Sequence, residues 1–225
     1  MHIEPGIVDG TKIVLSYATA AAAGGYALKL ADETVREQGM PSTAIRTAAT
    51  TLLVMFFFEI LPHFSVGVSE VHFIFGSTLF LIFGAAPAAL GLALGLLLQG
   101  LFLVPTDLPQ YGMNVTTLLV PLFAINALAA RVIAGDTAYV DLRYGQALSL
   151  STAYQAGIVA WVAFWAIYGR GLGAENLSSV ASFAGSYAMV IVVEPLVDLG
   201  VLALAKSLRG ILDGGFVTPR LHNAA

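Results

Sequence analysis

The stretch HFIFGSTLFLIFGAAPAALGLALGLLLQGLFLV, residues 72–104, decides the fold because it contains no Asp, Glu, Lys or Arg. A helix that crosses a bilayer needs roughly 20 apolar residues, so this stretch is too long for one ordinary span. The sequence Gly84-Ala85-Ala86-Pro87 can break it, since proline lacks the backbone N–H and clashes inside a helix. The stretch therefore predicts two membrane segments, His72–Phe83, which is short for a full crossing, and Pro87–Val104.

The rest of the chain is apolar in the same way. Of its 225 residues, 58% are hydrophobic and only 11% are charged, whereas soluble domains carry roughly 25% charged residues. A water-facing surface cannot be built from so few charged residues. Most of the protein surface must therefore face a lipid bilayer. We expect an all-α polytopic membrane bundle of about seven transmembrane helices, forming one integral membrane domain over residues 1–225. The other five segments are Ile13–Leu30, Ala44–Leu61, Val115–Ala134, Gln146–Tyr168 and Val180–Ala205.

The distribution of Lys and Arg predicts an orientation. If the N-terminus is outside and there are seven segments, only Lys12 and Arg170 fall on the outer side, and the other eight basic residues are cytoplasmic. This bias predicts a multi-pass protein of the cell inner (plasma) membrane. The polar residues 30–43 are interpreted as a cytoplasmic loop, and the residues from Arg209 onward as a short cytoplasmic tail. The basic residues assigned to the cytoplasm are Lys29, Arg36, Arg46, Arg131, Arg143, Lys206, Arg209 and Arg220.

Several classes of function find no support in the sequence. The chain has no cysteine, which excludes thiolate metal sites and thiol nucleophiles. Its formal net charge is −4 and it has no basic run, so nucleic-acid binding is not expected. No HExxH, GxSxG or Walker A motif is present. We therefore expect a protein that is not an enzyme and that binds no ATP by itself.

The first two residues offer metal-binding chemistry. The amine of Met1, the deprotonated amide of His2 and the His2 imidazole can close two fused chelate rings around one ion. These nitrogens lie nearly in a plane, and one further donor completes a square that suits Ni(II) or Cu(II). His72 opens an apolar segment on the same outer side and can supply that donor, although His72 taken alone is better interpreted as an interfacial histidine that caps a short helix. We interpret His63 as an ordinary loop residue and His222 as a solvated tail residue.

Two motifs resemble one transporter family. The start Met1-His2-Ile3, followed by Pro5-Gly6, is similar to the Met-His-Ile-Pro-Asp-Gly opening of the cobalt and nickel substrate-binding subunits of energy-coupling-factor (ECF) transporters, the CbiM/NikM family. The block Gly67-Val68-Ser69-Glu70-Val71-His72 resembles that family's Gly-Thr-Ser-Gly-His. Gln99 and Gly112-Met113-Asn114 follow the family pattern in order and spacing. The resemblance is clear from Phe56 to about Phe123 and general elsewhere.

The resemblance implies a metal site and a mechanism. Met1, His2 and His72 are then the ligands of Co(II) or Ni(II), which is the transported substrate. Gln99 and Asn114 are candidates for orienting a ligand or the inserted N-terminal segment. Two departures bear on the metal preference: Glu4-Pro5-Gly6 replaces Pro-Asp-Gly, and the longer block before His72 places Glu70 near the ligands.

The resemblance also implies partners. This chain is expected to be the substrate-specific component of an ABC-type uptake system, with a transmembrane coupling subunit, cytoplasmic ATPase subunits and possibly a small accessory membrane protein. Cobalt as the substrate suggests supply for cobalamin biosynthesis. Two runs of small residues, Ala20–Gly25 and Gly91–Gly95, are candidate contact surfaces for these partners.

One alternative uses the acids of the last segment. Glu194 and Asp198 are four residues apart and share a helix face. Carboxylates inside a membrane are costly and are candidates for function. They predict a proton relay in a self-sufficient secondary cation carrier, or else a buried pair satisfied by neighbouring polar groups.

Overall fold

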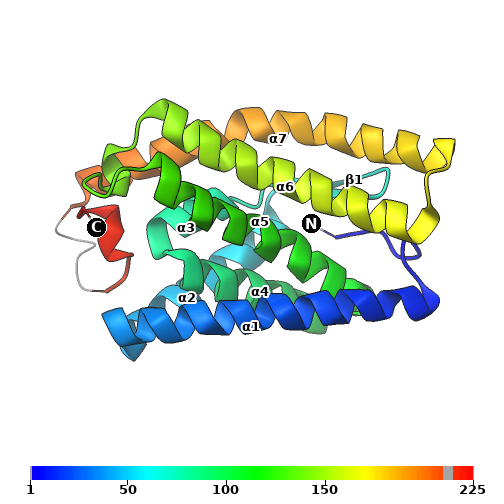
Figure 1. The fold of residues 1–225 in the computed structure, drawn as a ribbon, viewed down its shortest axis with the longest axis horizontal. Helices are drawn as coiled ribbons and strands as arrows, with labels where there is room; N and C mark the ends of the chain where they lie inside the picture. The colour runs from blue at the N-terminus through cyan, green and yellow to red at the C-terminus, as the bar shows by residue number, and fades with distance from the viewer. Residues whose placement is uncertain (1, 210–214, 225) are drawn as a thin grey trace.

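The computed structural model describes residues 2–209 and 215–224 and shows a bundle of α-helices (Figure 1). Six of the helices in this part of the chain are long and apolar enough to cross a membrane, whereas the eight-residue α3 extends only about 12 Å. The prediction of an all-α polytopic membrane fold is confirmed. The helices are α1 (Ile13–Gln38), α2 (Met40–Ile60), α3 (Gly76–Phe83), α4 (Ala85–Phe102), α5 (Tyr111–Val132), α6 (Tyr144–Arg170) and α7 (Ala174–Ser207).

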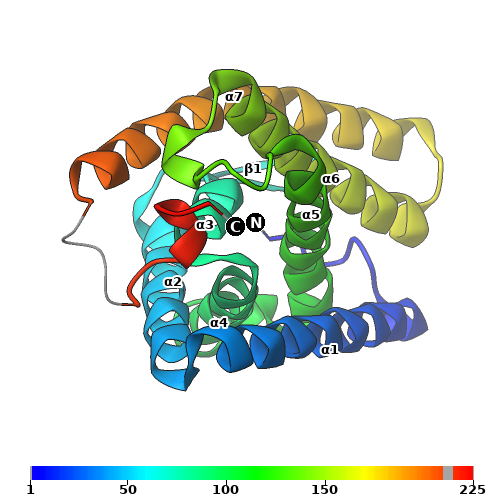
Figure 2. The same cartoon turned by 60° about the vertical axis from the view of Figure 1, so that its left-hand side comes forward.

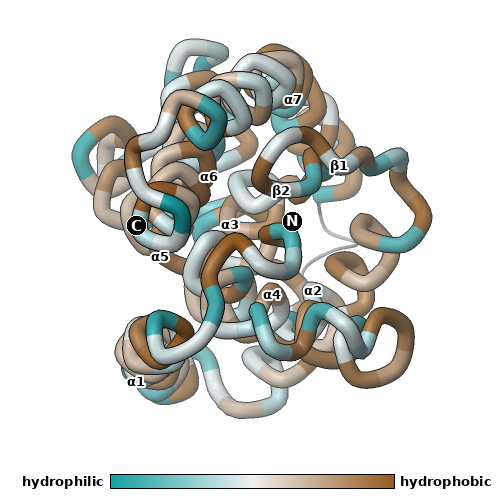
Figure 3. The backbone as a smooth tube through the Cα atoms, turned by 90° about the vertical axis from the view of Figure 1, so that its right-hand side faces the viewer, coloured by the Kyte–Doolittle hydropathy of each residue, from teal (hydrophilic) through white to brown (hydrophobic). Residues whose placement is uncertain are grey.

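The two chain ends occupy different parts of the bundle. The Lys12 ammonium donates to the carbonyls of Tyr168 and Gly169, so the beginning of α1 lies beside the end of α6. At the opposite end of the bundle, Arg220 of the C-terminal segment donates to the carbonyl of Ala134. The N-terminal segment turns back from α1 and ends among the helices, as the view along the bundle shows (Figure 3). Which end faces the outside of the cell stays a prediction.

The stretch 72–104 breaks where the sequence predicts. Gly84 separates α3 from α4 with a φ of 89°, a conformation that glycine adopts without the steric cost of a side chain. The first half is more irregular than expected, because residues 72–75 are not helical and α3 begins only at Gly76. A short antiparallel hairpin of β1 (Phe64–Val66) and β2 (Ser69–Val71) precedes it. The sequence analysis predicted no strands, since the pattern there is too short to show alternation.

The predicted loop 30–43 is wrong for most of its length. Helix α1 continues to Gln38 and a new helix starts after Gly39, whose φ is 86°. The polar residues of the last turns form exposed i,i+4 ion pairs, which suit a helix that projects beyond the apolar layer. Arg46, expected in or beside that loop, is fully buried and donates to the carbonyl of Phe83 and to the Gln38 side chain. It therefore ties the ends of α1 and α3 together.

The glycines of α4 face inward rather than toward a partner. A Cβ atom at Gly91 would lie 2.4 Å from Thr50, and one at Gly95 would lie 2.7 Å from Val54. These glycines let α4 pack closely against α2, as small residues do in membrane bundles. The expectation that Gly91–Gly95 forms a partner surface is therefore wrong. The other run, Ala20–Gly25, is mostly exposed on α1 and stays a prediction.

The C-terminal residues are not a free tail. The segment 215–224 folds back over one end of the bundle (Figure 2). The Thr218 N–H donates to the Ile82 carbonyl at 2.8 Å, and Leu221 is fully buried. His222, expected to be solvated, is only 6% exposed. The apolar side chains of Val217 and Leu221 explain why the segment is packed against the bundle: their burial is favourable, and it places neighbouring polar residues such as His222 in the same buried environment.

Candidate metal centre

The N-terminal segment is built into the bundle beside the hairpin. Its side chains Ile3, Ile7 and Val8 are each at most 2% exposed and belong to the hydrophobic core. Ile3 pairs with Ser69 as an antiparallel bridge, and the His2 carbonyl accepts hydrogen bonds from the Glu70 N–H at 2.9 Å and the Ser69 hydroxyl at 2.8 Å. Apolar burial and strand-like pairing therefore fix residue 2 at a defined place.

Helices α5 and α6 hold the same segment from the other side. The Ile3 N–H donates to Asn114 Oδ1 of α5 at 2.9 Å. A Cβ atom at Gly169 of α6 would lie 1.9 Å from the Ile7 carbonyl oxygen, so only glycine permits this close approach. Asn114 thus contacts the backbone of the inserted segment.

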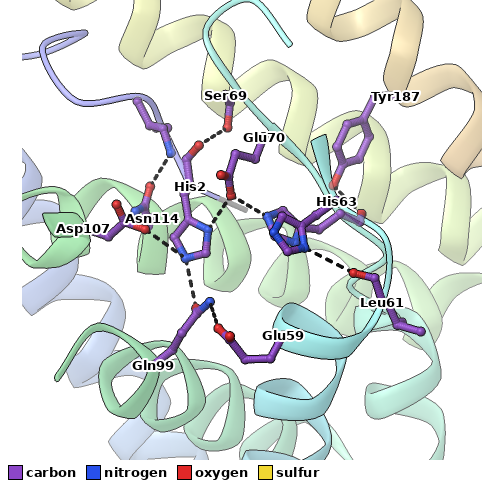
Figure 4. Close-up of polar contacts among 12 residues, drawn as sticks. His2, Glu59, Leu61, His63, Ser69, Glu70, Gln99, Asp107, Asn114 and Tyr187 are labelled. Carbon is purple, nitrogen blue, oxygen red and sulfur yellow. Dashed lines mark hydrogen bonds and ion pairs between the residues drawn. The ribbon is translucent and has the colours of Figure 1, made fainter. Parts of the chain in front are cut away.

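Three side chains converge at the end of this segment (Figure 4). Glu70 Oε2 lies 2.8 Å from His2 Nδ1 and 2.8 Å from His72 Nε2. His2 is 6% exposed and His72 is 1% exposed. Among the described residues these three form a group whose potential ligand atoms all lie within 4.8 Å of one another. Nitrogen and carboxylate oxygen donors at such separations can hold one divalent ion.

The second ring nitrogen of His2 has its own hydrogen-bond chain. Its Nε2 lies 3.0 Å from Gln99 Oε1, and Gln99 Nε2 donates to Glu59 Oε1 at 2.6 Å. Because Glu59 holds the amide nitrogen of Gln99, the amide oxygen faces His2. His2 Nε2 therefore donates to Gln99, and Nδ1, which faces Glu70 and His72, donates to the Glu70 carboxylate. To bind a metal, Nδ1 would release that proton, while the Nε2–H would stay hydrogen-bonded to Gln99, as is usual for a metal-ligating histidine.

Other polar residues complete a small enclosure. Asp107, in the 3-10 turn Pro105–Gln110, lies 3.6 Å from His2 Nε2. The exposed ring of His63 stacks on His72 with centroids 4.9 Å apart. Both residues line a cavity of about 80 Å³ that also contacts His2, Glu70 and His72. The sequence analysis did not assign Asp107 or Glu59 to the site, because only the folded chain brings their loops and helices to His2.

Burial and hydrogen bonding shape the charges of the site. Burial lowers the pKa of His72 to about 3, so its imidazole is neutral at physiological pH and has a lone pair to offer. Burial alone works to raise the pKa of Glu70, but hydrogen bonds from His2 and His72 hold it well below its usual range. Glu70 is therefore an ionised carboxylate between two ring nitrogens, which favours a cation there.

The predicted site residues divide into four groups. His2, His72 and Glu70 meet directly, while Gln99 and Asn114 contact the ring and the backbone of the N-terminal segment. Met1 lies outside the described residues. Glu194 and Asp198 do not join the histidines, since their hydrogen-bond partners are Gln155 and residues 74–78.

Comparison with known proteins places the chain in a family. The family described as the cobalt uptake substrate-specific transmembrane region, CbiM, matches residues 2–210. The chain belongs to this family. CbiM membership agrees with the predicted resemblance and identifies a multi-pass membrane transport protein rather than an enzyme. The folded-back residues 215–224 lie beyond the range that CbiM matches.

Structural comparison supports the same architecture. A solved structure described as a truncated transition metal transporter has a TM-score of 0.62 and 16% sequence identity, covering 92% of this chain and 97% of the other. At this identity the similarity establishes a shared fold. A search of curated protein sequences gives no match.

Proposed function

We propose that this CbiM-family chain captures Co(II) or Ni(II) at the outer face of the cell inner membrane, as the substrate-specific component of an ECF transporter. ATP hydrolysis by separate cytoplasmic subunits, linked through a transmembrane coupling subunit, then drives uptake. The observation that carries the proposal is the meeting of His2 Nδ1 and His72 Nε2 at the end of the inserted N-terminal segment. The family and the inserted segment together favour metal capture over any other use of these histidines.

The geometry of His2 agrees with the chelate inferred from the sequence. A six-membered ring that includes the His2 amide nitrogen and its own imidazole must use Nδ1. That atom faces His72 and Glu70, whereas Nε2 faces Gln99. The Met1 amine completes the predicted donor set of two main-chain nitrogens and two imidazoles. Gln99 and Asn114 would then hold the ring and the segment in place.

Glu70 adds a feature to this nitrogen site. In the absence of an ion its carboxylate accepts hydrogen bonds from both rings. A divalent ion bound by the two ring nitrogens would replace that contact and meet the same negative charge. An oxygen donor is tolerated by both Co(II) and Ni(II), so the residue supports metal binding without selecting one metal.

Isothermal titration calorimetry tests the proposal on the purified chain with a free Met1. We expect about one Co(II) or Ni(II) ion per chain, and loss of tight binding in His72→Ala and in a variant with two residues added before Met1. His222→Ala is the matched control, because that buried histidine lies beside the end of α1 and the start of α2 and does not line the cavity of the candidate site. Equal binding by the extended and native chains would rule out the N-terminal chelate.

Reconstituted vesicles separate the coupled transporter from the carrier. The proposal predicts metal uptake only when the ATPase and coupling subunits and ATP are present. Uptake by this chain alone under a proton gradient would instead establish a secondary carrier that uses Glu194 and Asp198.

A further inference from the structure

The His72 segment is confined in an unusual conformation. Phe75 precedes α3 with a φ of 54°, the left-handed region that residues other than glycine rarely adopt. A Cβ atom at the next residue, Gly76, would lie 2.1 Å from the ring of Tyr154 on α6. The chain between His72 and α3 therefore has little freedom, and its path is set by the helices around it.

Helix α7 contacts this segment along one face. The hydroxyl of Tyr187 donates to the His72 carbonyl at 3.3 Å. Seven residues further along α7, Glu194 Oε1 accepts the N–H groups of Ile74 at 3.2 Å and Phe75 at 3.0 Å. Positions 187 and 194 are two turns apart and lie on the same side of the helix. The backbone from residue 72 to residue 75 is thus bound to α7 at three atoms.

Asp198 lies one helical turn beyond Glu194 and contacts a different part of the chain. Its carboxylate accepts hydrogen bonds from the hydroxyls of Ser77 and Thr78, which belong to α3 itself. Glu194 contacts the irregular segment that carries His72, whereas Asp198 contacts the helix that follows. Both carboxylates are therefore buried, but only Glu194 contacts the segment that carries His72, so Asp198 can serve as a control for Glu194.

The need for an acceptor at Glu194 follows from the backbone. Ile74 and Phe75 precede the first residue of α3 and belong to no helix or strand, so their buried N–H groups need a partner outside regular secondary structure. Both N–H groups donate to Glu194 of α7 instead. Glu194 Oε2 also accepts a hydrogen bond from the Gln155 amide, so both carboxylate oxygens are occupied. A group engaged in this way is suited to holding a backbone rather than to passing protons.

We propose that Glu194 is a positioning residue that sets the place of His72 in the metal centre by holding the backbone of residues 74 and 75. The inference rests on the proposed function, since it assigns a role toward the His72 ligand. It replaces the proton-relay interpretation of Glu194 with a structural one. Its chemical requirement is an oxygen acceptor at this position and not a negative charge.

Two substitutions of Glu194 distinguish these requirements. Glu194→Gln keeps an oxygen acceptor for the two backbone N–H groups, and its new amide N–H can donate to Gln155 once that amide turns over. We expect Co(II) affinity within about threefold of the wild type and the same visible absorption spectrum of the bound ion. Glu194→Leu removes the acceptor, and we expect at least tenfold weaker affinity with a changed spectrum, because His72 no longer meets the ion in the same geometry. Asp198→Leu is the control and is expected to lower the thermal midpoint while affinity and spectrum stay close to wild type.

The outcomes separate the inference from the proposed function. If the wild-type chain binds neither Co(II) nor Ni(II), the proposed function fails whatever the variants do. If it binds Co(II) and Glu194→Leu has the wild-type affinity and spectrum, the positioning role is refuted and the metal site stands. If Glu194→Gln loses binding as Glu194→Leu does, negative charge is required and the inference is equally refuted.

A milder variant covers the case in which Glu194→Leu does not fold. Tyr187→Phe removes only the hydroxyl that donates to the His72 carbonyl. We expect a folded protein with a shifted Co(II) spectrum and a few-fold weaker affinity. An unchanged spectrum and affinity in Tyr187→Phe would contradict the claim that α7 positions this segment.

Discussion

Replacing Gln99 by leucine tests whether the hydrogen-bond chain behind His2 prepares that ring for metal. The Gln99 amide oxygen lies 3.0 Å from His2 Nε2, and its nitrogen is held by Glu59. Leucine has no acceptor and is one atom shorter than glutamine, so the variant removes the hydrogen bond while an apolar side chain fills most of the space. Gln99 is 3% exposed, so water cannot easily take its place.

The expected loss of affinity follows from the two states of the ring. With a metal on Nδ1, the Nε2–H must remain and loses its hydrogen bond to Gln99, with only the Asp107 carboxylate at 3.6 Å beside it, which costs roughly 1–3 kcal/mol when buried. Without metal, the ring can keep its proton on Nδ1 beside Glu70 and leave Nε2 bare, so it avoids most of that cost. The difference predicts a Kd for Co(II) or Ni(II) about 5- to 150-fold weaker.

Calorimetric titration of both proteins in the same detergent measures this change. Gln110→Leu is the matched control, because it removes another buried glutamine that makes no described contact with His2. We expect its affinity to equal that of the wild type. Wild-type affinity in Gln99→Leu would refute the reasoning, since it would mean that metal binding does not use Nδ1 with a proton on Nε2.

Three further substitutions or conditions give independent tests. Gly169→Ala should push the Ile7 carbonyl by about 1 Å or more and weaken metal binding. Gly185→Ala, where the added methyl group meets open space, is the control and should leave the affinity unchanged. Equal metal affinities of the two variants would contradict the tight docking of the N-terminal segment. Gly91→Ala should lower the free energy of unfolding by about 1–3 kcal/mol, visible as a lower thermal midpoint, because α4 must move away from α2; an unchanged midpoint would show that this contact yields at no cost. The metal-free protein should lose stability as the pH falls from about 6.5 toward 3, because His72 binds a proton below pH 6.5 in the unfolded chain but only near its pKa of about 3 when it is buried. In thermal melts, His72→Ala should reduce the dependence of the midpoint on pH. The same pH dependence in His72→Ala would exclude His72 as its source.

The sequence by itself determined that the chain lies in a membrane and which class of fold it adopts, and it predicted the candidate ligands. Low charge and long apolar segments required a membrane bundle, and the break near Pro87 follows from backbone chemistry that needs no tertiary context. His2 and His72 were recognisable because a free N-terminal Met-His start has chelating chemistry of its own and because the surrounding motifs resemble a family. Glu70 was noticed as an acid next to a predicted ligand, two residues before His72.

Only the tertiary structure decided which side chains meet and which polar groups are satisfied. Asp107 reaches His2 from the turn before α5, and Glu59 of α2 reaches the Gln99 side chain behind it; no local pattern encodes such contacts. The burial of His222 depends on packing against residues far away in the chain, at the end of α1 and the start of α2. The same holds for Glu194. The sequence shows that this carboxylate lies in a membrane helix, where burying it costs free energy, but only the packing of α3 on α7 brings it to its partners, the N–H groups of residues 74 and 75.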